Sequence, residues 1–125
     1  MTSIVEALDQ YGNRPYLLTV GEDGPHTSHT RVALAGGGLT CPLSKSAAGN
    51  VRARPAVSFL WPAIEPGGYA IIMNGTVRHV DDGGAEPVAS IDLSKAVFHR
   101  PGAPQPGHGG SCTSDCLPIQ LYEVV

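Results

Sequence analysis

Five polar residues in the first half of the chain are of the types that bind a phosphate group. Arg31 lies in a strand-like run, and Ser44, Lys45 and Ser46 stand at the start of a predicted helix that also contains Asn50. The first N–H groups of a helix have no partner inside it, and the helix dipole favours an anion there. Arg31 and Lys45 would add full positive charges. The alternative is that Arg31 is an exposed strand cation and that the serines only cap the helix.

The arginine is positioned by a predicted strand over residues 25–34. Its sequence, PHTSHTRVAL, alternates so that Thr27, His29 and Arg31 share one face, while hydroxyl and apolar side chains occupy the other. One face is therefore unusually polar for a strand of a protein core.

The serines and the lysine are positioned by a short strand and a helix. After a turn of three glycines, the run LTCPL leads toward the helix. Ser44 or Ser46 caps it, and the predicted helix extends from Ser46 to Arg54, because Pro55 cannot continue it. Cys41, within LTCPL, is predicted to be buried as a small hydrophobic residue.

The remaining pattern is that of short elements joined by turns. A first helix is predicted between a cap at Thr2 or Ser3 and a stop at Gly12. Gly75 is expected to form a bulge or a point of close backbone approach within a strand. Residues 90–100 fit either a strand or a short helix. Further strands are predicted at residues 16–20, 57–61, 69–80 and 117–125.

The composition favours one small β-rich domain. The chain has 125 residues, 42% of them apolar, with 16 glycines and 11 prolines. This length buries one hydrophobic core, and the many turn-forming residues suit short strands better than a helical bundle. We therefore predict a single domain over residues 1–125, a mainly β barrel or sandwich.

The charge pattern argues against nucleic acid and membrane as partners. The net charge is −3 at pH 7, and the eight lysines and arginines are spread along the chain, whereas nucleic-acid-binding domains cluster their basic residues. No run approaches the roughly 18 apolar residues of a membrane span, and the N-terminus lacks the basic start of a signal peptide. Three cysteines do not form a paired disulfide framework. We therefore expect a cytoplasmic, unanchored protein.

Residues 101–116 are rich in glycine and proline and are predicted to form a flexible loop. His99, His108, Cys112 and Cys116 follow the spacing H-x8-H-x3-C-x3-C in and beside this loop. These residue types bind zinc or haem iron, but structural zinc sites usually combine a close cysteine pair with stiff turns and a following core. We therefore predict no metal site here, and a mobile loop whose two cysteines can oxidise.

Five short motifs follow one another in an order that is typical of one known family. They are T-R-V at residues 30–32, S-K at 44–45, N-V-R at 50–52, R-P at 54–55 and AVSFLW at 56–61. In this order they resemble the FMN-binding split-barrel proteins. These are the relatives of pyridoxamine 5'-phosphate oxidase, and they include deazaflavin (F420)-dependent reductases.

The resemblance implies an antiparallel split β-barrel of six or seven strands with two short helices. It implies FMN as the cofactor, or alternatively F420, with its phosphate at the residues described above. The backbone from Thr30 to Val32 would hydrogen-bond the polar edge of the flavin ring. Trp61 would form a flat wall of the pocket, although packing in the core or at an interface is the other interpretation.

The implied activity is that of an oxidoreductase that passes a hydride to or from a small substrate. No serine–histidine–aspartate order, carboxylate pair or dinucleotide-binding glycine motif is present, so we assign no catalytic residue, and any chemistry would come from the cofactor. The resemblance also implies a homodimer with the cofactor site between the subunits. Two alternatives stay open: a flavin or haem carrier or sensor without turnover, and a cofactor-free binding module.

Overall fold

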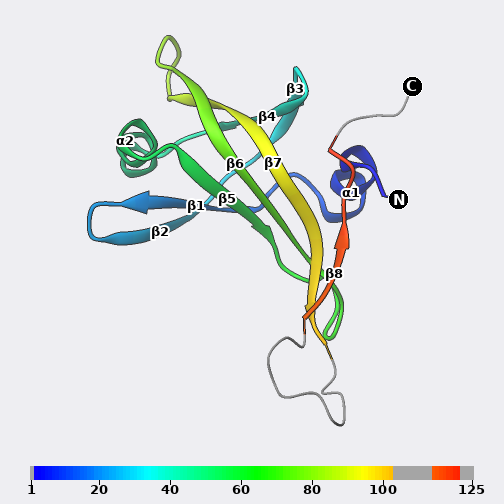
Figure 1. The fold of residues 1–125 in the computed structure, drawn as a ribbon. Helices are drawn as coiled ribbons and strands as arrows, with labels where there is room; N and C mark the ends of the chain where they lie inside the picture. The colour runs from blue at the N-terminus through cyan, green and yellow to red at the C-terminus, as the bar shows by residue number, and fades with distance from the viewer. Residues whose placement is uncertain (1, 103–113, 122–125) are drawn as a thin grey trace.

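The computed structural model describes residues 2–102 and 114–121. Two helices and eight strands follow one another in these ranges, and Figure 1 shows their arrangement. In chain order they are α1 (Ile4–Tyr11), β1 (Tyr16–Gly21), β2 (Gly24–His29), β3 (Ala33–Ala35), β4 (Gly38–Pro42), α2 (Lys45–Ala53), β5 (Ala56–Trp61), β6 (Ala70–Asp81), β7 (Val88–Pro101) and β8 (Ser114–Pro118).

The strands form one antiparallel sheet. Its order is β2-β1-β5-β6-β7-β4-β3, and β8 pairs with β7 outside that path. Every pair of neighbouring strands is antiparallel. In Figure 1 the long strands β6 and β7 cross the centre of the molecule, with α2 on one side of them and α1 on the other. The predicted fold class, a mainly β antiparallel split barrel with two short helices, is confirmed.

The two edge strands of the sheet are consecutive in the chain. β2 ends at His29 and β3 begins at Ala33, so only residues 30–32 join them. Four residue steps span at most about 14 Å, whereas a flat sheet of seven strands would hold its edges roughly 29 Å apart. The sheet must therefore curl until its two edges approach each other at this connection. We call residues 30–32 the closing link.

The pairing of β6 with β7 is long and contains two irregularities. Its register shifts at Asn74/Gly75 and at Val77/His79. A Cβ atom added at Gly75 would lie 2.6 Å from the carbonyl oxygen of Asp92, closer than real Cβ atoms come. Gly75 is therefore both a bulge and a point of close backbone approach, as predicted, and such a bend helps the sheet to curl.

The inner face of the sheet forms the core. Side chains alternate along each strand, so that on β1 and β5 the paired residues Leu17 and Phe59 are buried while their neighbours Leu18 and Ser58 are partly exposed. The apolar side chains that are almost completely buried include Phe59, Leu17, Leu39, Ile71, Met73 and Ile91. Burial of this inner face supplies the main favourable free energy of folding.

Both helices begin at the predicted kind of cap. The Ser3 hydroxyl accepts the N–H of Glu6 at 3.2 Å, and the Glu6 carboxylate accepts the N–H of Ser3 at 3.4 Å, which makes a capping box. α2 begins at Lys45 with Ser44 as its cap, one residue earlier than the predicted start. Neither helix in the described ranges is long and apolar enough to cross a membrane.

The predicted strand over residues 25–34 is wrong in its length. It is two strands, β2 and β3, separated by the irregular closing link. The N–H groups of Thr30 and Val32 donate to the carbonyls of Pro15 and Asn13 at 3.1 and 2.8 Å. Because Pro15 has no N–H to return a hydrogen bond, the facing segment cannot complete a regular ladder here.

The second half of the chain differs most from the prediction. Residues 90–100, which fitted either a strand or a helix, lie in β7. β8 starts at Ser114 and so takes the last three residues of the predicted loop, and it ends at Pro118 although a strand was predicted to run on to Val125. The described strands therefore number eight, where six or seven were expected. The predicted flexibility of the loop concerns mainly residues 103–113, which lie outside the described residues.

Gly75→Ala should lower the free energy of unfolding by about 1–3 kcal/mol, because the added methyl group would overlap the Asp92 carbonyl. Gly49 in α2 is the control, since nothing lies within 4 Å of an added Cβ atom there. Gly49→Ala should raise the stability by about 0.5–1 kcal/mol. Urea unfolding of both variants measures the two effects. Equal stability of the two variants would contradict the described course of β6.

Candidate functional site

The closing link places three predicted site residues in three different environments. Val32 is buried, with 4% of its surface exposed. The Thr30 hydroxyl donates to the carbonyl of Pro42 at 3.0 Å. The side chain of Arg31 is exposed, and its Nη2 lies 3.0 Å from Oε1 of Glu86. Arg31 is therefore the link side chain that an anion in solution can reach.

The N-terminus of α2 faces solvent. Ser44 Oγ accepts the N–H of Ala47 at 3.1 Å and so satisfies one of the unpaired donors of the first turn. The side chains of Ser44, Lys45 and Ser46 are exposed. The side of the helix that packs against the barrel consists of Ala47, Ala48 and Val51. This packing leaves the remaining first-turn N–H groups available to an anion.

The closing link is bonded to the end of β4, the strand that leads into α2. The Thr30 hydroxyl attaches the link to the end of β4, two residues before the helix cap. The next residue, Leu43, donates its N–H to the carbonyl of Pro87 at 2.8 Å, and Pro87 directly follows the glutamate that pairs with Arg31. These contacts connect the segment that bears Arg31 with the connection before α2. We call Arg31, Ser44, Lys45 and Ser46 the anion site, as the candidate predicted from the sequence.

Asn50 and Trp61 are placed elsewhere. Asn50 Nδ2 donates to Oγ1 of Thr19 at 3.0 Å, which satisfies a hydroxyl on a residue that is 1% exposed and ties α2 to β1. The Trp61 indole N–H donates to the carbonyl of Gly12 at 2.9 Å, and the residue is 2% exposed. The burial of Trp61 is explained by its packing in the core. Contact of Asn50 or Trp61 with a cofactor stays a prediction.

The sequence analysis did not identify Glu86. This residue lies in the turn between β6 and β7, in a segment with no clear pattern, and its partner Arg31 is 55 positions away in the chain. An acidic residue among glycines carries no local signal of such a partner. Lys45 forms no ion pair with any residue that the structure describes.

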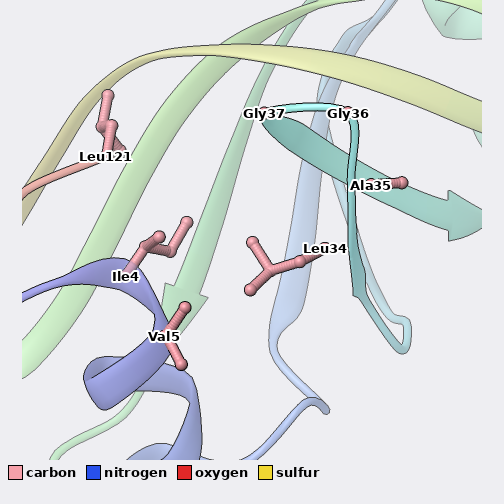
Figure 2. Close-up of a pocket in the computed structure, with 7 residues that line it drawn as sticks. All are labelled: Ile4, Val5, Leu34, Ala35, Gly36, Gly37 and Leu121. Atoms are coloured by element: carbon pink, nitrogen blue, oxygen red, sulfur yellow. The ribbon is translucent and has the colours of Figure 1, made fainter. Parts of the chain in front are cut away.

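An apolar pocket opens between α1 and the turn that joins β3 to β4. Figure 2 shows Ile4 and Val5 of α1 facing the side chain of Leu34, with the turn between β3 and β4 and Leu121 completing the walls. Its volume is about 310 Å³. Leu34 follows Arg31 by only three residues. The pocket lies at the β3–β4 turn, whereas the anion-site residues of α2 follow the other end of β4. A ligand in this pocket would meet mainly apolar surface.

A polar cluster lies at the other end of β7. The Tyr69 hydroxyl donates to Oδ2 of Asp115 at 2.8 Å, and Arg100 Nε donates to the same oxygen at 3.0 Å. The Arg100 guanidinium also lies 4.3 Å from the centre of the Tyr69 ring. The hydrogen bond from Tyr69 lowers the pKa of Asp115 and raises the pKa of Tyr69 itself. The cluster holds β8 against β7, and we assign it a structural role.

His99 and Cys116 face each other across β7 and β8. His99 Nδ1 lies 3.3 Å from Cys116 Sγ. His108 and Cys112, the other members of the predicted spacing, lie outside the described residues. Among residues 2–102 and 114–121, no three histidine, cysteine, aspartate or glutamate side chains are grouped as a metal site requires. The expectation that this region binds no metal stays a prediction.

Comparison of the amino-acid sequence with known proteins identifies two mycobacterial relatives, while no protein-family model matches. These are the uncharacterised protein Mb0449c of Mycobacterium bovis and the uncharacterised protein MT0457 of Mycobacterium tuberculosis. Each is 32% identical over 71 residues, which cover 54% of this chain and 50% of the relative. The chain therefore spans about half the length of the curated relatives it matches.

Comparison of the fold identifies solved structures that cover most of the chain. A protein from Listeria innocua assigned as a pyridoxamine 5'-phosphate oxidase has a TM-score of 0.62 at 19% identity, over 75% of this chain and 94% of that one. An F420 reductase has a TM-score of 0.58 at 18% identity, over 73% and 94%. HutZ, the haem storage protein from Vibrio cholerae, has a TM-score of 0.59 at 13% identity, over 78% and 95%.

The chain therefore has the split-barrel fold of the pyridoxamine 5'-phosphate oxidase-like proteins, as the order of its motifs predicted. The names of these structures cover an oxidase, a deazaflavin reductase and a haem storage protein. At these identities the likeness establishes the fold.

Cys41 in β4 should not react with a thiol reagent in the native protein at pH 8. It is 1% exposed, and burial raises the pKa of its thiol to about 11, against a smaller lowering by the hydrogen bond with Thr30. The thiol therefore stays protonated at pH 8. The pKa of this thiol is higher in the folded than in the unfolded state. Its contribution to the free energy of unfolding is therefore fully present below the unfolded pKa of about 8.5, and it is lost as the pH rises toward the folded pKa.

Thiol counting with dithionitrobenzoate in a Cys112→Ser variant measures this. The native variant should show one thiol, from the exposed Cys116, and unfolding should release a second. Two reactive thiols in the native variant would contradict the buried position of Cys41.

Proposed function

We propose that this protein is a flavin-type oxidoreductase that binds FMN, or alternatively the deazaflavin F420, and passes a hydride to or from a small substrate. The observation that supports the proposal is the hydrogen bond from the segment that bears the exposed Arg31 to Pro42, two residues before the exposed cap of α2. Both cofactors contain a phosphate. The fold shared with an F420 reductase and with a protein assigned as a pyridoxamine 5'-phosphate oxidase supports the proposal.

Each residue of the anion site would contribute to phosphate binding. Arg31 and Lys45 would neutralise the phosphate through charge-assisted hydrogen bonds. The hydroxyl groups of Ser44 and Ser46 and the first N–H groups of α2 would add donors. When bound, FMN or F420 supplies the hydride chemistry. The residues of this chain would bind the cofactor, orient it and keep water from one side of it.

The closing link can provide only part of the predicted contacts to the flavin ring. The N–H groups of Thr30 and Val32 already donate to carbonyl groups of the segment before β1. The N–H of Arg31 and the carbonyl groups of the link are the backbone groups proposed to meet the ring's polar edge. The ring would then extend toward the apolar pocket that begins at Leu34 (Figure 2).

A carrier or sensor without turnover is the second candidate function. The anion site contains arginine, lysine and serine side chains, and the carboxylate beside it, that of Glu86, is paired with Arg31. None of these groups is placed as an acid or base for a substrate, so we assign no catalytic residue. The haem storage protein HutZ, which has this fold, supports the same alternative.

The proposal includes a homodimer with the cofactor site between the subunits. On the outer face of the sheet, Tyr16, Leu60, Ile72 and Val97 are successive cross-strand neighbours on four strands. All four side chains are partly exposed. A continuous apolar row of this kind suits a two-fold interface in which each subunit presents the same surface.

Sedimentation at low micromolar concentration should give about twice the 13.0 kDa mass of one chain. Ile72→Asp, at the centre of the row, should shift the protein toward the monomer, because it would bury a charge in the interface. Ile64→Asp is the matched control, since Ile64 is 61% exposed in the loop between β5 and β6. A wild-type mass near that of one chain would rule out the dimer.

Arg31→Ala should weaken the binding of FMN by about 1.5–3 kcal/mol, the scale of a charged hydrogen bond. Arg78→Ala is the control, because Arg78 is an exposed arginine of β6 that pairs with Asp92 at 3.2 Å. Titration of flavin fluorescence measures both variants, and the same titration with F420 tests the alternative cofactor. If neither cofactor binds at micromolar concentration and Arg31→Ala changes nothing, the protein is better described as a cofactor-free binding module.

A further inference from the structure

The turn between β6 and β7, residues 82–87, is attached to Arg31, to the connection before α2 and to the last turn of α2. Near its end, Glu86 Oε1 lies 3.0 Å from Nη2 of Arg31. Its last residue accepts a backbone N–H from the connection between β4 and α2 at 2.8 Å. At its start, Asp82 accepts hydrogen bonds from Nη2 of Arg52 in α2 at 2.6 and 2.7 Å. We call residues 82–87 the acidic latch.

The carboxylate of Glu86 contacts the guanidinium group of Arg31 at a position that an external anion could also occupy. Carboxylate and phosphate oxygens present the same acceptor chemistry to a guanidinium group. A phosphate that binds to Arg31 must therefore displace Glu86, or else lie beside a second negative charge. The contact is also weak enough to be displaced, because the two side chains are 61% and 52% exposed, and such surface ion pairs contribute little.

We propose that Glu86 is an internal competitor for the anion site, and that a ligand with a phosphate monoester binds by releasing the acidic latch from Arg31. This inference rests on the proposed function of the anion site. A phosphate monoester carries up to two negative charges at neutral pH, and it gains Lys45 and the N-terminus of α2 in addition to Arg31. The carboxylate of Glu86 has one charge and reaches Arg31 alone among the described cations. The exchange therefore favours the phosphate.

Glu86→Gln tests the latch, because it removes the competing charge and keeps the size of the side chain. FMN should bind about two- to five-fold more tightly to this variant, the factor expected when a weak surface ion pair no longer occupies the site. Riboflavin, which lacks the phosphate, should bind equally to the variant and the wild type. In an Arg31→Ala background, Glu86→Gln should have no effect on FMN. Glu65→Gln is the matched control, since it removes an exposed charge from the loop at the other end of β6.

The outcomes separate the latch from the proposed function. If Arg31→Ala weakens FMN binding but Glu86→Gln leaves it unchanged or weakens it, the latch is wrong and the anion site stands. If Glu86→Gln strengthens the binding of riboflavin and of FMN equally, the proposed competition at Arg31 is also wrong. The same conclusion follows if Glu65→Gln strengthens FMN binding as much as Glu86→Gln does. If FMN does not bind, inorganic pyrophosphate replaces it as the probe in calorimetry. Tighter pyrophosphate binding by Glu86→Gln then supports the latch without a flavin, and no binding by either protein overturns it.

Discussion

Three residues join the two edges of the sheet, and the structure depends on that short connection. Strands β2 and β3 are consecutive in the chain but stand at opposite ends of the strand order. Three residues can connect the two edges of this sheet only if the sheet curls. The close backbone approach at Gly75, in the centre of the sheet, allows that curling. The hydrophobic pattern of the strands is compatible with either a barrel or a sandwich. The short connection between β2 and β3 is what requires the barrel.

The same connection accounts for the position of the anion site. In the closing link, Val32 turns into the core and Thr30 holds the end of β4, while the side chain between them, that of Arg31, is exposed to solvent. Closure of the barrel therefore bonds the segment that bears Arg31 to the end of the strand that leads into α2, where we propose the phosphate site. The turn between β6 and β7 also reaches this segment, because its Glu86 forms an ion pair with Arg31.

Features that depend on nearby residues could be predicted from the sequence, and features that depend on distant partners could not. The cap at Ser3, the bulge at Gly75 and the antiparallel fold follow from local residue types and spacing. The break of the strand at residues 30–32 follows from hydrogen bonds to a segment with a proline, which no periodicity reveals. The ion pair of Arg31 with Glu86 could not be predicted from the sequence either, because the two residues meet only once the barrel has closed.

The most direct test of this account is a crystal structure of the protein grown with FMN. We predict the phosphate at the N-terminus of α2, within hydrogen-bond distance of Arg31 and Lys45. Glu86 should be turned away from Arg31, and the flavin ring should be directed toward the pocket of Figure 2. A flavin bound elsewhere on the barrel, with the Arg31–Glu86 ion pair intact at 3.0 Å, would contradict the claim that closure of the barrel builds a phosphate site.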